Sequence, residues 1–290
     1  MTPEPDIADP LNLMAEYNQR VAAVAVDILE SITERLTKHQ VTHEEYRAAW
    51  RWVIGLADSG EVPLFLDLFF ESTVERLTFD GRPGSAGSVE GPYHLPDAPE
   101  LTGRPFVLPM RADEPGTPML VRGQVIDTAG VAHPGVEVDM WQAGNDGTYS
   151  GFVGDAPRSN LRGRMRTDEH GQFAVRTIRP AAYQIPRSGP TGEFLGMIGQ
   201  HAWRPAHFHF ILTSAGHQPL TTQLYFRGGD WLDETLPGGG DVAGAVKDSL
   251  IIDIGRDNDP DTIAAFGFDG PYETADHTFI LSPAVPTPTV

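Results

Sequence analysis

The stretch Arg204-Pro-Ala-His-Phe-His209 is the part of the sequence from which both the fold and the chemistry can be approached. It leads into an apolar run, Phe208 to Leu212, whose composition is typical of a β-strand. Alternate side chains of a strand share a face, so His207 and His209 are expected side by side, roughly 7 Å apart at Cα. Two imidazoles on one face can bind one metal ion, although a pair of hydrogen-bonded strand histidines has the same spacing. Residues elsewhere in the chain must decide between these interpretations.

The composition excludes several kinds of site. The chain has 290 residues, of which 40% are hydrophobic, so a substantial core can form. It contains no cysteine, which excludes disulfides, zinc–thiolate sites, iron–sulfur clusters and cysteine nucleophiles. Any metal must therefore be held by nitrogen and oxygen ligands. The net charge of −19 argues against a surface that binds nucleic acid.

Membrane insertion and secretion are not indicated by the sequence. No run of residues approaches the 18 consecutive apolar positions that a membrane-spanning helix requires. The first residues, Met1 to Asp6, are acidic and lack the basic and apolar regions of a secretory signal. We therefore expect no membrane span and a cytoplasmic location.

Residues 11–80 have the periodicity of helices. The first helix carries an apolar stripe at helical spacing, made of Val21, Val24, Ile28, Ile32 and Leu36. Thr42 and Glu45 have the spacing of a capping box before a second helix, and Pro63 can occupy the first turn of a third. The stripe of the first helix is wide enough to pack against a second subunit as well as against the core.

A Gly- and Pro-rich segment at 79–104 separates the helices from a region of short strands. The expected strands are 105–109, 119–126, 136–142, 172–178, 206–213, 220–226, 250–254 and 278–281. Short strands without helical patterns between them favour a β-sandwich. The sequence thus predicts a mainly β protein, with a helical dimerisation and linker domain at 1–104 and a catalytic β-sandwich at 105–290. The long connections 143–162 and 180–203 are where functional residues are expected.

Each of these two connections contains a tyrosine. Tyr149 follows Asn145-Asp-Gly-Thr148, and Tyr183 lies between Arg179-Pro180 and Ile185-Pro186. Either tyrosine alone could be a loop anchor whose hydroxyl has an ordinary hydrogen-bond partner. A phenolate is also a hard, anionic donor, and a strong Lewis acid could deprotonate it at neutral pH.

Four separated motifs, in one order along nearly the whole chain, carry a family resemblance. They are Glu90-Gly-Pro-Tyr93 with Leu108–Gly116, Gly147-x-Tyr-Ser150, Tyr183-x-Ile-Pro186 with Gly189-Pro190, and Arg204–His209 with Leu220-Thr-Thr-Gln223. With these motifs the chain resembles the intradiol ring-cleavage dioxygenases, the group of catechol and chlorocatechol 1,2-dioxygenases. A His-x-His pair alone would not be specific enough for this comparison.

The resemblance implies a metal centre and a reaction. One Fe(III) per subunit would be held by Tyr149, Tyr183, His207 and His209. The substrate would be catechol or a chloro- or methyl-substituted catechol, cleaved with O2 to a cis,cis-muconate. Tyr183 would leave the metal and accept a substrate proton, Arg204 would stabilise charge that develops on the substrate, and Gln223 would support the site from a neighbouring strand.

The resemblance also implies a substrate cavity and an assembly. The cavity would be lined by Leu64, Asp67, Val89, Gly91, Pro92, Tyr93, Ile185 and Pro186. An aspartate at position 67 resembles the chlorocatechol and hydroxyquinol branches, so a hydroxyquinol 1,2-dioxygenase that forms maleylacetate is an alternative. The family pattern further implies a homodimer with a phospholipid bound between the helices of its two subunits.

Three other classes of protein remain as rivals. Cupins also carry His-x-His on a strand, but they need a glutamate soon after it, and Phe210 to Ala215 include no acid. Metal hydrolases of the TIM-barrel type need alternating helices that residues 105–290 do not show. A transthyretin-like β-sandwich that only binds other molecules would use the same tyrosines and histidines as structural residues.

Overall fold

The computed structural model describes residues 10–152, 154–233 and 239–284, with side chains from residue 19 onward. The acidic first residues and the end of the Pro/Thr-rich tail lie outside these ranges. The chain forms two compact units, one ending at Gly55 and one beginning at Leu56. The predicted division at 104/105 stays a prediction.

The first unit is helical, as the sequence predicts. It consists of α1 (Pro10–Lys38) and most of α2 (His43–Asp58). The predicted capping box is confirmed: the Glu45 carboxylate accepts from the Thr42 N–H at 2.7 Å, and the Glu45 N–H donates to Thr42 Oγ1 at 3.3 Å. The apolar stripe of α1 is exposed, because Val21, Ile28 and Ile32 keep 50%, 54% and 50% of their surfaces.

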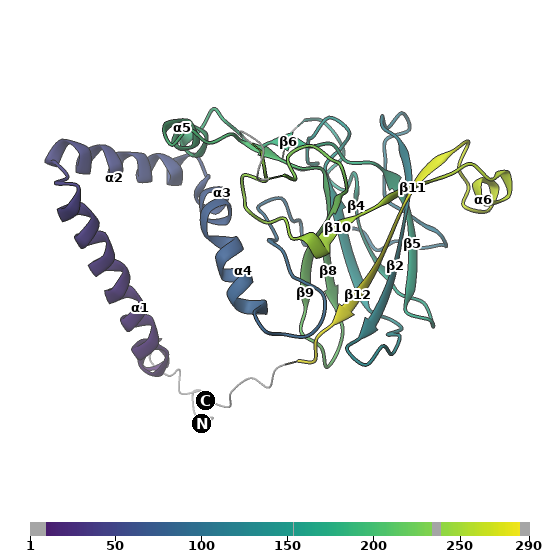
Figure 1. The fold of residues 1–290 in the computed structure, drawn as a ribbon, viewed down its shortest axis with the longest axis horizontal. Helices are drawn as coiled ribbons and strands as arrows, with labels where there is room; N and C mark the ends of the chain where they lie inside the picture. Colours follow the sequence, from purple (N-terminus) through teal and green to yellow (C-terminus); the bar gives the residue numbers. More distant parts are fainter. Residues whose placement is uncertain (1–9, 153, 234–238, 285–290) are drawn as a thin grey trace, which may run out of the picture. The chain divides into compact units, whose positions relative to one another are not determined.

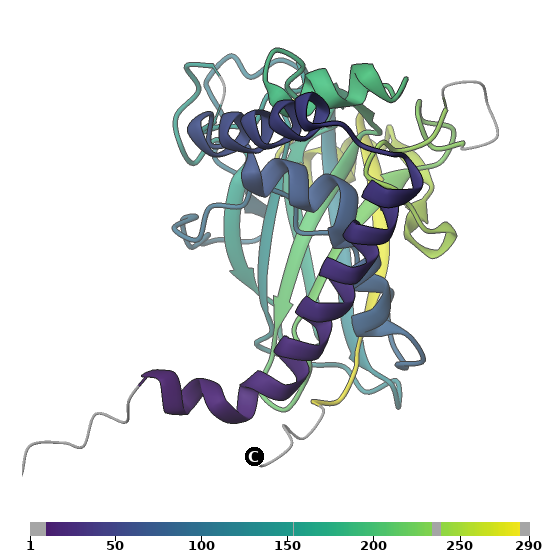
Figure 2. The same ribbon diagram turned by 90° about the vertical axis from the view of Figure 1, so that its left-hand side faces the viewer.

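The expected third helix is a series of three helical segments in the second unit. They are α3 (Val62–Leu66), the π-helix η1 (Asp67–Glu71) and α4 (Ser72–Phe79). Pro63 lies in the first turn of α3, as predicted. Figures 1 and 2 show these segments lying along the sheet that contains β8 (His207–Thr213) and β9 (Leu220–Phe226). A π-turn adds one residue to a helical turn, so the 3.6-residue pattern of the sequence could not reveal it.

Two five-stranded sheets form the sandwich (Figure 1). One sheet has the order β1-β5-β2-β12-β11, and the other has the order β10-β9-β8-β3-β4. The strands are β1 (Phe106–Val107), β2 (Pro118–Asp127), β3 (Glu137–Gln142), β4 (Arg162–Arg166), β5 (Gln172–Ile178), β8 (His207–Thr213), β9 (Leu220–Phe226), β10 (Ile251–Ile252), β11 (Ile254–Asp257) and β12 (Tyr272–Leu281). The predicted mainly β sandwich with a helical N-terminal part is confirmed.

Most expected strands are present, but the sequence pattern missed several elements. It missed β4, the small pair β6 (Tyr183–Gln184) and β7 (Trp203–Arg204), and the helices α5 (Pro190–Met197) and α6 (Pro260–Ala265). The strand expected at 250–254 is divided between the 3-10 turn η2 (Asp248–Leu250), β10 and β11. β4 was missed because Arg162-Gly-Arg-Met-Arg166 has little of the apolar content that identifies a strand.

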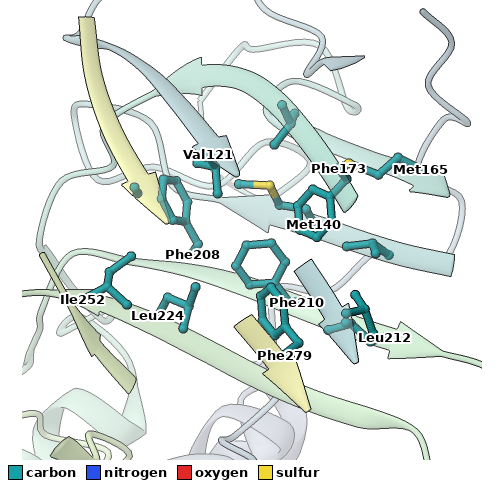
Figure 3. Packing of buried hydrophobic residues seen from close by; sticks show 14 of the residues in the cluster. Val121, Met140, Met165, Phe173, Phe208, Phe210, Leu212, Leu224, Ile252 and Phe279 are labelled. Atoms are coloured by element: carbon teal, nitrogen blue, oxygen red, sulfur yellow. The ribbon is translucent and has the colours of Figure 1, made fainter. Parts of the chain in front are cut away.

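The core lies between the two sheets, and β8 shows how it is formed (Figure 3). Phe208, Phe210 and Leu212 are fully buried in this core and alternate with His207, His209 and Ile211. Phe210 contacts the ring of Phe279 from β12 of the opposite sheet, with centroids 5.1 Å apart. The same strand therefore contributes one face to the core and presents the predicted histidines on the other.

Within the described part of the chain, no helix combines the length and the apolar character needed to cross a membrane.

Candidate active site

The two histidines of β8 lie with their ring nitrogens converging. His207 and His209 are each 1% exposed, and their Nε2 atoms are 3.0 Å apart. The Nδ1 of His207 lies 2.6 Å from the Pro205 carbonyl oxygen and donates to it, which leaves its Nε2 with a free lone pair. The expected side-by-side placement of the two imidazoles is therefore present.

Tyr149 reaches the histidines from the long connection between β3 and β4. Its hydroxyl oxygen lies 3.0 Å from Nε2 of His209 and 3.4 Å from Nε2 of His207. The connection turns at Gly147, where φ is +79° and a Cβ atom would come within 2.8 Å of Tyr183 Cβ. Only glycine fits this close approach without strain, so Gly147 allows the two tyrosines to meet.

Tyr183 lies on β6, opposite Arg204 of β7. Its ring centroid is 5.3 Å from that of Tyr149 and 5.8 Å from that of His207, and the side chain is buried. The structure thus brings the four residues predicted as ligands into one buried cluster, from three distant segments of the chain.

The donor atoms of this cluster have a spacing that suits a metal ion. Bonds of about 2.1 Å that meet at right angles keep two donor atoms about 3.0 Å apart. The Tyr149 oxygen and the two Nε2 atoms are separated by 3.0, 3.0 and 3.4 Å. Among the described residues, no group of three or more His, Cys, Asp or Glu side chains has a geometry that could hold a metal. A metal ion in this cluster would therefore need phenolate ligands.

The protonation states agree with a metal site. Burial, with the nearby Arg204 cation, lowers the pKa of His207 to about 3, and burial also holds the pKa of His209 well below its ordinary value. Both imidazoles are therefore neutral at pH 7 and can donate lone pairs. Burial raises the pKa of Tyr149 and of Tyr183, so only a strong Lewis acid would convert these phenols to phenolates at neutral pH.

Arg204 is held beside the cluster by a carboxylate that the sequence analysis missed. It donates from Nε and Nη2 to the two oxygens of Asp241, at 3.0 and 2.9 Å, and both side chains are almost fully buried. Burial alone would raise the pKa of Asp241, but the Arg204 cation holds that pKa below its ordinary value. The buried pair places Nη1 of Arg204 3.5 Å from Nε2 of His207.

Gln223 connects Arg204 with His209. It lies on β9 directly opposite His209, as the sequence analysis expected of a neighbouring strand. Its Oε1 accepts from Arg204 at 2.9 Å and from the Tyr225 hydroxyl at 2.6 Å, while its Nε2 donates to the Val89 carbonyl and lies 3.2 Å from Nδ1 of His209. These bonds fix the position of the His209 ring.

Trp141 is a further contact of the site that sequence reasoning missed. It lies on β3 opposite His209 and stacks on that ring, with centroids 4.6 Å apart and an interplanar angle of 11°. The His94 ring contacts Trp141 at 4.7 Å and pairs through Nε2 with Asp139 at 3.0 Å. Hydrogen bonds to Asp139 and then Glu90 raise the pKa of His94 to about 9.

A pocket adjoins the cluster on the side of α3 and η1. Seven of the eight residues predicted to line a substrate cavity line it: Leu64, Asp67, Val89, Gly91, Pro92, Tyr93 and Ile185. The eighth, Pro186, lines a neighbouring hollow that also contacts Tyr93 and Tyr183. The pocket also includes Leu68, Glu71 and Ala243, which the sequence analysis missed, together with Tyr183 and Arg204.

The acidic wall of this pocket is formed by η1. Burial and then Glu90 raise the pKa of Asp67, and burial is also the main cause that raises the pKa of Glu71. Glu71 accepts a hydrogen bond from the Glu90 N–H at 2.7 Å, which fastens the segment that continues into Gly91. A Cβ at Gly91 would lie 3.7 Å from Cε1 of His209, so the backbone here passes close to the cluster.

The missed residues share one difficulty. A buried arginine needs a nearby carboxylate, so Arg204 signals that a partner such as Asp241 must exist, but nothing in the sequence says which of the 40 acidic residues it is. Trp141 could have been placed from the period-two pattern of 136–142 only if the pairing of β3 with β8 had been known. Both contacts depend on tertiary structure.

Comparisons with known proteins agree with this fold and cluster. A family model described as "Dioxygenase" matches residues 89–272, and one described as "Catechol dioxygenase N terminus" matches residues 18–84. The chain is therefore a dioxygenase. More narrowly, it belongs to the intradiol ring-cleavage dioxygenase family.

Relatives and solved structures support this assignment over most of the chain. A chlorocatechol 1,2-dioxygenase of Rhodococcus opacus is 38% identical over 91% of this chain and 98% of its own length. A chlorocatechol 1,2-dioxygenase of a Pseudomonas species is 42% identical over 74% of this chain and 85% of its own. The crystal structure of a 3-chlorocatechol 1,2-dioxygenase from Rhodococcus opacus is similar with a TM-score of 0.82 and 39% identity, over 91% of this chain and 99% of that one.

The contacts of His94 generate a prediction about stability and pH. Because the pKa of His94 is raised on folding, its contribution is complete below about pH 6.5 and is lost as the pH rises through about 9. The substitution His94→Gln should therefore lower the free energy of unfolding by about 1 kcal/mol at pH 6 and by much less at pH 10. Urea unfolding at the two pH values measures this difference.

The matched control is His170→Gln, because the side chain of His170 is 73% exposed. It should leave the free energy of unfolding nearly unchanged at both pH values. An equal loss of stability in His94→Gln at pH 6 and pH 10 would contradict the assigned ion pair.

Proposed function

We propose that this dioxygenase binds one Fe(III) per subunit through Tyr149, Tyr183, His207 and His209. With O2 it cleaves the ring of a catechol between its two hydroxyl-bearing carbons and forms a cis,cis-muconate. The observation that carries the proposal is the convergence of the Tyr149 oxygen and both Nε2 atoms to within 3.0–3.4 Å of one another. Neutral nitrogens and anionic phenolates form a hard donor set that suits a trivalent ion.

The ion and the protein would divide the chemistry. A bound ferric ion supplies Lewis acidity, which draws electron density from the catecholate ring and makes it reactive toward dioxygen. A catechol must lose two protons to bind as a dianion. The Tyr183 phenolate would accept one of them, and a hydroxide ion in the site would accept the other. Tyr183 is suited to this role because it lines both the cluster and the substrate pocket.

Arg204 stabilises negative charge as it develops on the substrate. It lines the pocket, and its guanidinium is fixed by Asp241 and Gln223 before any substrate arrives. A cation that is already oriented in a buried site stabilises charge without reorganisation during the reaction. Gln223 acts indirectly, because it holds both Arg204 and the His209 ring.

The pocket supports a chlorocatechol, or a similarly substituted catechol, as the substrate. Leu64, Val89 and Ile185 give it an apolar wall that can contact an aromatic ring and its substituent. The relatives named chlorocatechol 1,2-dioxygenase are 38–42% identical, whereas those named catechol or hydroxyquinol 1,2-dioxygenase are 27–30% identical. Asp67 favours hydroxyquinol as a second candidate, since its carboxylate could accept a hydrogen bond from a third hydroxyl group.

Removing one proposed ligand should abolish both colour and activity. Tyrosinate–Fe(III) charge transfer gives a visible band, so the iron-loaded wild type should be red-brown. In Tyr149→Phe and in His209→Ala the three remaining ligands should no longer retain the ion, so we expect this band to disappear and ring cleavage to fall by more than about 100-fold. Visible absorption, iron content and oxygen uptake measure the two effects.

The control for the ligand variants is Tyr46→Phe, because Tyr46 is an exposed residue of α2. This variant should keep the colour and the activity of the wild type. Full colour in either ligand variant would show that the ligand assignment is wrong.

A panel of substrates separates the two candidate specificities. We expect the highest kcat/KM with 4-chlorocatechol or 4-methylcatechol, then catechol, and the lowest with hydroxyquinol, because the wall beside the ring is mostly apolar. Ultraviolet absorbance of the products measures the rates. Should hydroxyquinol be the best substrate, and should Asp67→Ala reduce kcat/KM for it alone, the second candidate would be correct.

We propose that the helical part of the chain, which the sequence analysis places at 1–104, forms the contact between two subunits. The exposed apolar stripe of α1 supports this proposal, because leaving apolar side chains such as Val24, Leu29 and Ile32 in contact with water costs free energy. A phospholipid bound between the helices of the two subunits would cover apolar surface that the helices leave open. We further propose that residues 105–290 form the catalytic β-sandwich and that the protein is located in the cytoplasm.

The assembly can be measured directly. At micromolar concentration, light scattering should give the mass of a dimer, and the double variant Ile28→Glu with Ile32→Glu should give that of a monomer, because charged side chains replace the apolar stripe. The matched control is Glu30→Gln with Glu34→Gln, two acidic positions on the same helix, which should remain dimeric. A monomeric wild type would contradict the proposed dimer.

A further inference from the structure

Arg162 is a buried cation that the proposed mechanism does not use. It is the first residue of β4 and is 1% exposed. Its Nε donates to Ser150 Oγ at 3.0 Å, its Nη1 to the Tyr93 carbonyl at 2.6 Å, and its Nη2 to the Ser150 carbonyl at 2.8 Å. All three acceptors are neutral, so hydrogen bonding satisfies the guanidinium without balancing its charge.

The nearby carboxylates are engaged elsewhere. Asp139 pairs with His94 at 3.0 Å, and Asp97 forms a two-bond pair with Arg158. Within the described residues, no ion pair to Arg162 is formed. Arg204 differs in this respect, because it is also buried but has Asp241 as its partner. Burying a guanidinium without an ion-pair partner costs several kcal/mol, so the hydrogen bonds and ring contacts of Arg162 must offset that cost.

The Arg162 guanidinium faces two aromatic rings, and one of them belongs to the proposed ligand Tyr149. The guanidinium carbon lies 5.9 Å from the centroid of this ring and 5.7 Å from that of Phe152. A cation that faces an aromatic ring is attracted to that ring. The attraction is stronger when the ring carries a negative charge in an environment of low polarity. Ser150, which accepts two of the hydrogen bonds, directly follows Tyr149 in the chain, so the same contacts also fix the tyrosine.

We propose that Arg162 is a positioning residue of the metal centre, because its guanidinium fixes Ser150, the residue after Tyr149, and faces the Tyr149 ring. It acts through Tyr149 and does not touch the substrate. The proposal rests on the proposed function, because Tyr149 is an anion only when it binds the ferric ion. Its backbone contact to Tyr93 gives it a second effect, since the same guanidinium holds a pocket residue and a ligand loop together.

The charge of Arg162 persists under working conditions. Burial lowers the pKa of Arg162 to about 10, while the Tyr149 ring and Asp139 act in the opposite direction. The guanidinium is therefore protonated at neutral pH. A fixed cation beside the phenolate lowers the energy of the electrons that the phenolate transfers to iron in the visible transition. Loss of the cation should move this transition to lower energy.

The experiment compares the iron-loaded wild type with Arg162→Gln, Arg162→Lys and the control Arg164→Gln. Arg164 lies on the same face of β4 and donates to the Ala98 carbonyl at 2.9 Å, so it matches Arg162 in residue type and in a backbone contact. We expect the visible band to shift to longer wavelength in Arg162→Gln and to stay at the wild-type position in Arg162→Lys and Arg164→Gln. Iron loss to a chelator should be several-fold faster in Arg162→Gln only.

The outcomes separate this inference from the proposed function. A wild-type protein that binds iron without a visible band would show that the proposed ligand set is wrong. A normal wild-type band that is unshifted in Arg162→Gln, or shifted equally in Arg162→Gln and Arg162→Lys, would contradict the proposed role of the Arg162 charge. It would leave the proposed function unaffected. If the glutamine variant does not fold, Arg162→Met, whose side chain is apolar, takes its place with the same expected shift.

Discussion

One row of side chains across the second sheet is the constraint on which the rest of the structure depends. The strand registers place Arg162 of β4 opposite Trp141 of β3, Trp141 opposite His209 of β8, and His209 opposite Gln223 of β9. Residues paired in this way point to the same face of a sheet. A slip of one residue in any pairing would turn one member of the row into the core. The packing of Phe208 and Phe210 between the sheets therefore also fixes the site, because it sets the register of β8.

The charges around this row follow a consistent pattern. The buried histidines are neutral, and the buried tyrosines carry charge only when a metal is bound. Arg204 has a partner in Asp241, so its charge is balanced before it takes the role that we propose for it toward a substrate. Arg162, by contrast, has neutral hydrogen-bond acceptors and faces the Tyr149 ring.

The sequence predicts the parts of the site that depend on local pattern. The period of two in β8 places His207 and His209 on one face, and the apolar strand that contains Gln223 could be expected beside it. The sandwich and the N-terminal helices follow from periodicity, and the motifs around Tyr149 and Tyr183 indicated ligands only through resemblance to a family. The contacts of Trp141, Asp241 and Arg162 were not predictable, because each depends on which strands pair and on which distant loop returns to the sheet. The polar composition of β4 hid even the strand that carries Arg162.

The π-helix η1 has a consequence for how substrate preference can change. It contains one residue more per turn than an α-helix would, and it carries Asp67 into the pocket wall. Loss of a single residue there would restore regular winding and rotate the preceding side chains by about 100° around the axis. The sheets and the row of side chains across them would keep their register. Deletion of one codon could therefore change which side chains form that wall of the pocket, while the proposed metal centre keeps its geometry.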